Sequence, residues 1–498
     1  MNVNPITRLD YPDPDVIRVE DTYYMVSTTM HFMPGCEILQ SFDLVHWEHV
    51  TYVYETLDHT DAQQLKSGQN IYGQGMWAAS LRYHEGRFCI CFVANDTRKT
   101  YLYTSEKIDG PWKKQLIEGF YHDGSLLFDE DGRNYIVYGN DEIWITELNE
   151  DLTAPKKDGL HRLLVSDHKN PELGYEGSHI QKINGYYYIF LIHSLRDRWM
   201  RTEACFYSDS LEGEFTGGDV LCDDRGYCGQ GVAQGGIVDT PDGKWYAILF
   251  QDSGAVGRIP VLIPVTWTDH FPVFGQNGHV PEEIEVHSTR PGYIYQPLVG
   301  SDDFCNGLLP RWQFNHDPDP RYYHLDALQG TYTITTREVC TELTQAVNTL
   351  TQRMSYPSCA AEVTVDASAL KEGDVAGLCA LQSCYAAVGI TKHHGKYEVL
   401  MLDKKEDGIL DMTEGTVVES HQMDFRLEAD FCNMKDEARC YYRVNKGDWL
   451  PIGTVHKLYF KLDHFTGCRF GLFCYAAEET GGSACFRDFK YYDVDEIS

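Results

Sequence analysis

Three acidic residues occupy matching places in a repeated pattern of this chain. Five segments each contain an apolar run, a polar turn that ends in Gly or Asp, and an aromatic-rich apolar run. They span residues 16–28, 80–93, 125–139, 178–192 and 236–250. Nine residues before the turn glycines Gly86, Gly132, Gly185 and Gly243 lie Trp77, Asp123, Glu176 and Gln234, and eight before the turn residue Asp21 lies Asp13. If the five segments are equivalent in space, Asp13, Asp123 and Glu176 converge on one site.

Three carboxylates in one cleft suit the hydrolysis of a glycosidic bond. This reaction needs an acid with a raised pKa to protonate the leaving oxygen, and an ionised carboxylate to act on water or on the anomeric carbon. A third carboxylate nearby raises the pKa of the acid by like-charge repulsion. Glu176, with its longer side chain, is the natural acid, and Asp13, stiffened by Pro12 and Pro14, is the natural base.

Each candidate also has a purely structural interpretation. Asp13 and Asp123 taken singly are typical of turns, whereas Glu is rarely buried at the start of a strand without a reason. The shared register of the three acids is what favours a site. Trp77 offers an apolar face to a sugar ring. Arg258, just beyond the fifth hairpin, is able to bind substrate hydroxyls or to form a structural ion pair.

The elements around these residues predict an all-β fold. Short apolar runs are broken every 8–12 residues by Gly, Asp, Asn or Pro. The five turn positions are spaced by 65, 46, 53 and 58 residues, which predicts a five-bladed β-propeller of about four strands per blade over residues 1–295. Segments 36–50, 99–117 and 204–221 are expected to be outer strand pairs, with Trp47, Trp112 and Phe215 packed between blades.

A second domain is predicted over residues 301–498. After a Pro- and Gly-punctuated stretch at 286–300, long alternating strands appear and the hairpin pattern stops, which favours an antiparallel β-sandwich. Acidic residues stand near its two ends, at Asp302, Asp303 and Asp488. Asp303 and Asp488 are candidates for a structural Ca²⁺ site, with surface turns as the alternative.

Composition narrows the function further. The formal charge is 42 − 75 = −33, and no Lys or Arg run is long enough for a nucleic acid or an anionic membrane. No apolar run approaches the ~20 residues of a transmembrane helix, and no leader-type pattern opens the chain. The sixteen cysteines form no CxxC pair, which indicates free thiols in a reducing compartment. We therefore expect a cytoplasmic protein, either monomeric or a homo-oligomer, and the acidity is compatible with a neutral substrate. Hydrolysis of a glycosidic bond by the three carboxylates would require no organic cofactor.

An ordered set of motifs resembles glycoside hydrolase family 43. The set consists of YPDPDVIRVEDTYYMVSTT, SFDLVHW, GMWAASLRY, YHDGSLLFDEDG, GYEGSHI and DTPDGKWY. This family of five-bladed propellers includes β-xylosidases and α-L-arabinofuranosidases, and the tail from residue 301 looks like the concanavalin-like sandwich of its β-xylosidases. The resemblance implies that Asp13 is the general base, Asp123 the pKa modulator and orienter, and Glu176 the general acid. It also implies a substrate-binding role for Arg258, and inversion with acid and base carboxyls about 6.5–9.5 Å apart.

The chain departs from the family pattern at several places. Many relatives carry a histidine, associated with a central calcium or water, where this chain has Gln234. The family's WAP motif is WAA here, and Met30, followed by His31 and Phe32, stands where several β-xylosidases place an aromatic. Gln234, Met30 and Phe32 are therefore candidate substrate contacts. In related proteins a sandwich loop closes over the active-site rim, which makes a pocket and favours exo attack.

These observations predict an inverting exo-glycosidase that removes terminal β-D-xylosyl or α-L-arabinofuranosyl residues from short xylan-derived oligosaccharides. The alternatives are a carbohydrate-binding propeller without catalysis and a propeller glycosidase of other specificity, such as a fructan-cleaving enzyme or a phosphorylase. A non-catalytic propeller predicts a missing carboxylate, and a fructan-cleaving one an NDPNG-like first turn. A phosphorylase predicts a cationic phosphate pocket.

Overall fold

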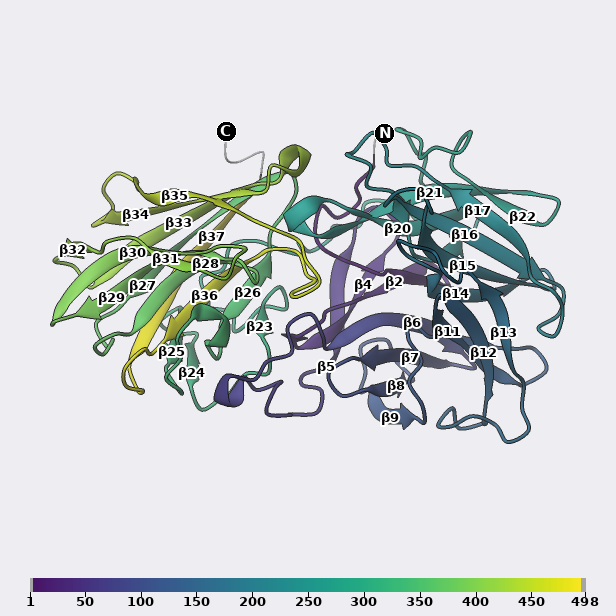
Figure 1. The fold of residues 1–498 in the computed structure, drawn as a ribbon, viewed down its shortest axis with the longest axis horizontal. Coiled ribbons are helices and arrows are strands. Elements are labelled where there is room, and N and C mark those ends of the chain that lie inside the picture. Colours follow the sequence, from purple (N-terminus) through teal and green to yellow (C-terminus); the bar gives the residue numbers. More distant parts are fainter. Residues whose placement is uncertain (1–2, 494–498) are drawn as a thin grey trace.

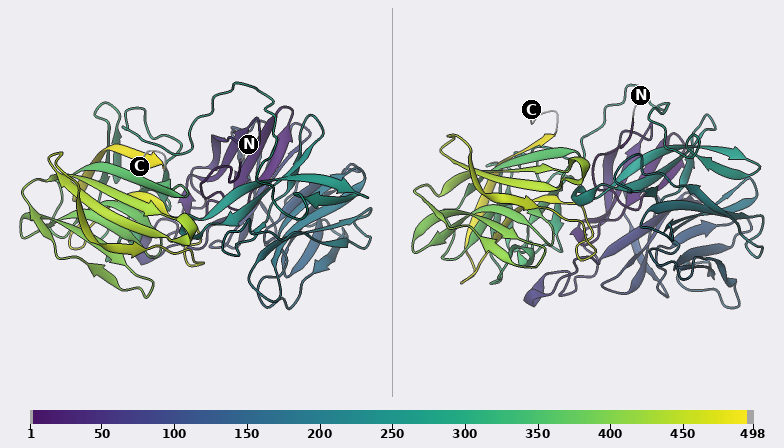
Figure 2. Two further views of the ribbon diagram at one scale, coloured as in Figure 1. Left: turned by 90° about the horizontal axis from the view of Figure 1, so that it is seen from above. Right: turned by 45° about the horizontal axis from the view of Figure 1, so that its top comes forward.

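Strands form almost all of the regular structure in the computed structural model, which describes residues 3–493. The chain first builds a ring of five sheets and then a two-sheet sandwich beside it (Figure 1). Two further views show the same side-by-side arrangement of the two bodies (Figure 2). The predicted propeller followed by a sandwich is therefore confirmed.

Each of the five predicted hairpins forms the two innermost strands of one blade. The first three blades contain β1 (Asp15–Val19), β2 (Thr22–Ser27), β4 (Gly35–Ser41) and β5 (Glu48–Tyr54); β6 (Met76–His84), β7 (Arg87–Ala94), β8 (Lys99–Ser105) and β9 (Lys113–Ile117); and β10 (Ser125–Phe128), β11 (Asn134–Asn140), β12 (Glu142–Leu148) and β13 (His161–Ser166). The fourth contains β14 (Glu176–Ile183), β15 (Tyr186–Ser194), β16 (Arg201–Ser208) and β17 (Thr216–Leu221). The fifth contains β18 (Val232–Ala233), β19 (Ile237–Asp239), β20 (Trp245–Asp252), β21 (Arg258–Thr268) and β22 (Phe271–Phe274).

Apolar side chains fill the spaces between neighbouring blades. Trp47 of the first blade packs in one buried cluster with Val238 and Tyr246 of the fifth, which closes the ring. Phe215 lies in the cluster between the third and fourth blades, and Trp112 packs against the cluster between the first and second. The aromatic residues of the outer strand pairs therefore hold blades together, as predicted.

The sandwich consists of one sheet of nine strands and one of seven. The larger sheet contains β3 (Phe32–Met33), β23 (Gln313–Asn315), β26 (Leu350–Arg353), β28 (Val375–Leu381), β29 (Ala386–His393), β30 (Lys396–Lys404), β31 (Leu410–Met412), β32 (Thr416–Val418) and β36 (Arg469–Tyr475). The smaller contains β24 (Tyr323–Asp326), β25 (Thr331–Thr335), β27 (Ser358–Asp366), β33 (Gln422–Asp430), β34 (Glu437–Val444), β35 (Leu450–Lys457) and β37 (Ser483–Asp493). Four 3-10 turns lie in connections: η1 (Lys66–Gly68), η2 (Gly254–Val256), η3 (Leu343–Gln345) and η4 (Cys432–Met434).

The two domains share a sheet and buried ion pairs. Strand β3 belongs to the propeller sequence but pairs with β23 of the sandwich. Arg353 of the sandwich lies 2.8 Å from a Glu37 carboxylate oxygen and stacks 4.1 Å from the ring centre of Tyr11. Strand pairing and this ion pair therefore fasten the sandwich to the propeller.

One arginine joins the inner strands of four blades at the centre of the ring. Arg82 of β6 forms an ion pair of 2.8 Å with Asp15 of the first blade. It also donates to Ser125 Oγ at 2.7 Å and to the Leu126 carbonyl at 2.8 Å in the third blade, and to the Ile180 carbonyl at 3.2 Å in the fourth. Because these acceptors are buried, the hydrogen bonds of Arg82 hold the inner strands of the four blades together at the centre of the propeller.

Replacing Arg82 by alanine is expected to destabilise the protein by about 3 kcal/mol, because Asp15 loses its buried charge partner. The measurement is the midpoint of urea unfolding. Arg133→Ala is the matched control, since its bond to Asp131 joins two half-exposed side chains, and it should change stability by less than about 1 kcal/mol. Equal effects of the two substitutions would contradict the structural role of Arg82.

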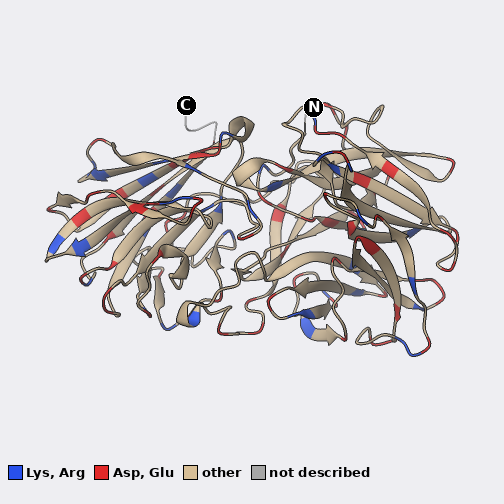
Figure 3. Ribbon diagram, viewed as in Figure 1, with Lys and Arg blue, Asp and Glu red and all other residues tan. Residues whose placement is uncertain are grey.

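Acidic residues outnumber lysine and arginine in this chain, 75 to 42. Lys and Arg are scattered over both domains among the more numerous acids (Figure 3). All sixteen cysteines are unpaired. Between residues 3 and 493 no helix has the length and apolar character needed to cross a membrane.

Candidate active site

The five positions found by counting lie at one rim of the propeller, where each innermost strand begins. Asp13 and Asp123 come two residues before β1 and β10, and Glu176 is the first residue of β14. Trp77 lies at the start of β6, and Gln234 lies in the break between β18 and β19.

Irregular backbone at these positions turns the side chains out of the strand pattern. Asp13, Asp123 and Gln234 have left-handed φ angles of 52°, 47° and 63°, which are uncommon for residues other than glycine and often occur at functional sites. At Trp77 and Glu176 the strand register shifts instead, between Met76 and Ala79 and between Glu176 and His179. Both kinds of irregularity stop the regular alternation of side chains where the strands meet the rim.

Asp13 is held with hydrogen-bond donors on both carboxylate oxygens. Thr28 Oγ1 donates to Oδ2 at 2.6 Å, and Arg258 Nη1 donates to Oδ1 at 3.0 Å. Both Asp13 and Arg258 are buried. Of the two interpretations of Arg258, the structure shows the ion pair, and this pair orients the Asp13 carboxylate.

His122 joins the other two carboxylates. Its Nε2 lies 3.3 Å from Glu176 Oε2 and 3.5 Å from Asp123 Oδ2. Asn140 Nδ2 donates to the same Glu176 oxygen at 2.7 Å, and the backbone N–H of Gly177 donates to Asp123 Oδ2 at 3.0 Å. Asp123 and Glu176 are therefore fixed side by side with a histidine between them.

Burial and charge shift two pKa values in this group. Burial, followed by repulsion from Glu176 and Asp13, raises the pKa of Asp123 to about 6, although His122 opposes the rise. Burial lowers the pKa of His122, but Asp123 and the hydrogen bond to Glu176 outweigh this effect and raise it to about 9. The raised carboxyl pKa thus resides on Asp123, the residue expected from the sequence to raise the pKa of its neighbour.

His122, Asp123 and Glu176 also form the one group of three ligand-type side chains, among residues 3–493, whose atoms approach closely enough to hold a metal ion. The oxygens concerned already accept hydrogen bonds from Asn140 and Gly177. Donors aimed at these oxygens suit a carboxylate that exchanges protons better than a metal ligand.

A loop of the sandwich forms one wall of the site. It connects β35 to β36, and the Phe465 ring in it lies 5.7 Å from the Trp77 ring centre and 4.2 Å from the Arg258 guanidinium. Arg258 also donates to the Phe465 carbonyl at 3.3 Å, and the Gly467 N–H donates to Asp10 at 2.8 Å. This is the wall that the sequence predicted without identifying the loop.

Met30 and Phe32 occupy positions that differ from the prediction. Met30 is buried, and its backbone pairs with Met76, next to Trp77. Phe32 is fully buried in a cluster with sandwich residues, and the Arg469 guanidinium lies 3.4 Å from its ring centre. Because neither side chain is accessible, the expected contact with a sugar is not supported. Phe32 instead joins the propeller to the sandwich.

Gln234 lies beside the acid-bearing strand. A Cβ on Gly177 would come within 2.7 Å of Gln234 Cδ, so the side chain covers the residue after Glu176. The Arg82 guanidinium, which joins four blades, forms an ion pair with Asp15. His179 Nδ1 lies within hydrogen-bond distance, 3.0 Å, of the second Asp15 carboxylate oxygen.

The acidic residues at the ends of the sandwich do not assemble into a ligand group within residues 3–493. Asp302 accepts from the Phe304 N–H and from Trp312 Nε1, and Asp303 accepts from the Cys305 N–H. Asp303 and Asp488 are exposed. Their arrangement therefore corresponds to the surface-turn alternative and gives the proposed calcium site no support.

Comparison with known families agrees with this geometry. The model for glycosyl hydrolases family 43 matches residues 3–272, and the model for the beta xylosidase C-terminal concanavalin A-like domain matches residues 301–492. The chain belongs to glycosyl hydrolase family 43. It is therefore a glycoside hydrolase, and the resemblance drawn from its motifs is confirmed.

Several relatives of this family 43 enzyme extend over its whole length. A beta-xylosidase of Formosa agariphila is 26% identical, over 99% of this chain and 89% of the relative. A bifunctional GH43-CE protein of Bacteroides eggerthii is 42% identical with a TM-score of 0.92; the alignment covers 98% of this chain but only 63% of that longer one. An engineered GH43 enzyme with endo-xylanase and exo-arabinofuranosidase activity is 27% identical with a TM-score of 0.86, over 99% of both chains.

Proposed function

We propose that this enzyme is an inverting exo-glycosidase that removes terminal β-D-xylosyl or α-L-arabinofuranosyl residues from short xylan-derived oligosaccharides. The observation that carries the proposal is the division of the three carboxylates into two environments. Asp13 is ion-paired with Arg258, whereas Glu176 and Asp123 share His122. Two carboxyl groups held in different environments suit separate acid and base roles. The activities named for the relatives support the choice of sugars.

In this proposal Glu176 is the general acid. Its carboxyl proton passes to the glycosidic oxygen as the bond to the anomeric carbon breaks, so the leaving sugar departs as an alcohol. Asn140 and His122 fix the Oε2 atom of Glu176. Because an acid contributes only when its proton points at the leaving oxygen, this fixing is a condition for catalysis.

Asp13 is the general base on the other side of the sugar. Its carboxylate removes a proton from a water molecule, and the oxygen of that water forms the new bond to the anomeric carbon. Arg258 and Thr28 hold this carboxylate in a fixed orientation through hydrogen bonds to its two oxygens. One displacement without a covalent intermediate inverts the configuration.

Asp123 and His122 set the charge of the site. Ionised Asp123 and protonated His122 carry opposite charges beside Glu176, so their summed charge is close to zero. Phe465, Trp77 and Arg258 close one side of the site. A closed side makes a pocket for a chain end, and a pocket supports exo attack.

A panel of aryl β-xyloside, aryl α-L-arabinofuranoside and xylobiose in phosphate-free buffer tests the proposed function. We expect release of free xylose or arabinose from at least one of them. Release of no sugar would contradict the proposal and favour a carbohydrate-binding propeller. Turnover that requires phosphate and yields a sugar phosphate would instead favour a phosphorylase.

The pH profile is expected to depend on His122. Activity should fall as the pH drops through about 6, where Asp123 becomes protonated. His122 lowers the pKa of Asp123, so His122→Asn should raise it and move the acid limb of kcat/KM to higher pH, by about one unit. His84→Asn, at the opposite end of β6, is the control and should leave the limb in place. If the acid limb of kcat/KM in His122→Asn does not move, or moves to lower pH, then His122 does not lower the pKa of Asp123 as described.

A further inference from the structure

The rim above Glu176 carries an exposed tryptophan. Glu176 pairs with Ile192 of β15, and Ile192 pairs with Glu203 of β16, so the three residues lie at one level of the fourth blade. Trp199 precedes Glu203 by four residues, in the connection from β15 to β16. It therefore lies at the active-site end of the blade, on the order of 10 Å beyond the level of Glu176.

Trp199 is held in place although the residue is 45% exposed. The guanidinium of buried Arg201 lies 5.2 Å from the Trp199 ring centre, within the range of a cation–π contact. Arg201 is itself fixed by an ion pair of 2.7 Å with Asp252 and lies 5.2 Å from the ring centre of Phe250. The indole is thus packed against Arg201 on one face. Nearly half of the residue remains exposed to solvent, although tryptophan is usually well buried.

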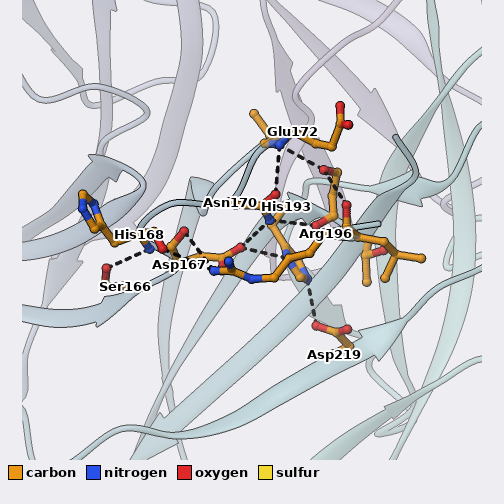
Figure 4. A network of polar contacts seen from close by, with 12 residues as sticks. Ser166, Asp167, His168, Asn170, Glu172, His193, Arg196 and Asp219 are labelled. Carbon is orange, nitrogen blue, oxygen red and sulfur yellow. Dashed lines mark hydrogen bonds and ion pairs between the residues drawn. The ribbon is translucent and has the colours of Figure 1, made fainter. Parts of the chain in front are cut away.

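The connection from β15 to β16, which carries Trp199, is tied to the segment before β14 that contains Asp167. Figure 4 shows Arg196 of this connection beside Asp167. Arg196, in this loop, forms an ion pair of 2.5 Å with Asp167. Asp167 also lies 3.2 Å from His193 Nδ1, and His193 Nε2 lies 2.8 Å from Asp219. The loop closes on itself through the Leu195 N–H and the Met200 carbonyl at 3.1 Å. These bonds keep the indole in position before a ligand arrives, which lowers the entropy cost of binding.

The direction of the reaction places the leaving chain on this side. The acid protonates the leaving oxygen, so the leaving sugar lies against the blade that supplies Glu176, which is the fourth. The Phe465 wall contacts Trp77 of the second blade and Arg258 of the fifth. We propose that Trp199 is a second sugar platform, which stacks on a unit of the leaving chain beyond the sugar next to the cleaved bond. This inference rests on the proposed function and adds a preference for substrates longer than a disaccharide.

The test compares Trp199→Ala with the wild-type enzyme on three substrates. All three carry the terminal sugar that the wild type releases. In the first this sugar is linked to an aryl group, in the second to one xylose, and in the third to a chain of three xyloses. We expect kcat/KM for the tetrasaccharide to fall about five-fold to ten-fold, mainly through KM, as for the loss of one aromatic stacking contact. The values for the aryl glycoside and the disaccharide should stay within about two-fold, because neither reaches the platform. Trp199→Phe should restore most of the preference for length.

Tyr83→Ala is the matched control, since Tyr83 is also 45% exposed but lies near the opposite end of β6; it should not change the ratio of tetrasaccharide to aryl glycoside. An unchanged ratio in Trp199→Ala, or an equal loss on all three substrates, would overturn the platform. If the wild-type enzyme releases sugar from none of the three, the proposed function itself fails. If it releases sugar and only the ratio is insensitive to Trp199, the proposed function stands and this inference falls.

Discussion

Replacing Glu176 by alanine is expected to reduce kcat/KM for xylobiose by about 10²-fold to 10⁴-fold, the contribution of a positioned general acid. An aryl glycoside with a good leaving group should lose far less, because its leaving oxygen needs little protonation. The expected result is therefore a large difference between two substrates that share the same terminal sugar, measured with the same enzyme preparation.

Glu172→Ala is the matched control for this prediction. Glu172 is an exposed glutamate four residues before Glu176 in the same blade, and its replacement should leave both substrates unaffected. An equal loss on xylobiose and on the aryl glycoside in Glu176→Ala would contradict the acid role and indicate a general disturbance of the site. Asn140 and His122 lose a shared acceptor in this variant, so thermal unfolding should be measured alongside.

Replacing Asp13 by asparagine is expected to have the second large effect, also about 10²-fold to 10⁴-fold in kcat/KM. Here the loss should be the same for xylobiose and for the aryl glycoside, since activation of water is needed whatever group leaves. Asparagine keeps the size of the side chain and still offers an oxygen to Arg258 or Thr28, so the fold should be preserved.

Asp21→Asn is a suitable control, because Asp21 lies on the turn at the far end of the same hairpin. A loss confined to the substrate with the poor leaving group would assign Asp13 to leaving-group protonation instead and would reverse the roles of Asp13 and Glu176. The pair of variants thus separates acid from base without a bound ligand.

Sequence reasoning located the carboxylates because each blade repeats the same local geometry. Each inner strand begins at the rim and ends at a turn marked by Gly or Asp. Because side chains alternate with a period of two residues along a strand, residues at the same distance before this turn take equivalent places in the different blades. Counting from the turn therefore finds residues that meet in space, such as Asp123 and Glu176. The irregular backbone at Asp13 and Gln234 could not be read from their residue types.

Long-range contacts were beyond reach of the same reasoning. Phe465 lies 207 residues from Arg258 along the chain, and no pattern in the sandwich strands marks its loop as the wall. Phe32 was a candidate substrate contact because it follows the position where several relatives place an aromatic, but its strand adds to the sheet of the sandwich and is buried there. Neither pairing follows from local propensity.

His122 and Asn140 were missed although both carried a signal. His122 immediately precedes Asp123, and Asn140 ends β11, the partner of the strand that follows Asp123. Both are polar residues at the rim ends of hairpin strands. The five-position count considered one residue in each blade, whereas the site takes three residues from the third.

The central claim is that Asp13 and Glu176 act together in one displacement, without a covalent intermediate. Proton NMR of the first sugar released from an aryl β-xyloside or, if that is the substrate cleaved, an aryl α-L-arabinofuranoside tests this claim most directly. The account predicts that the opposite anomer appears first, α-xylose or β-arabinose, and that mutarotation follows. First appearance of the anomer present in the substrate would contradict it, because retention requires a covalent glycosyl-enzyme intermediate.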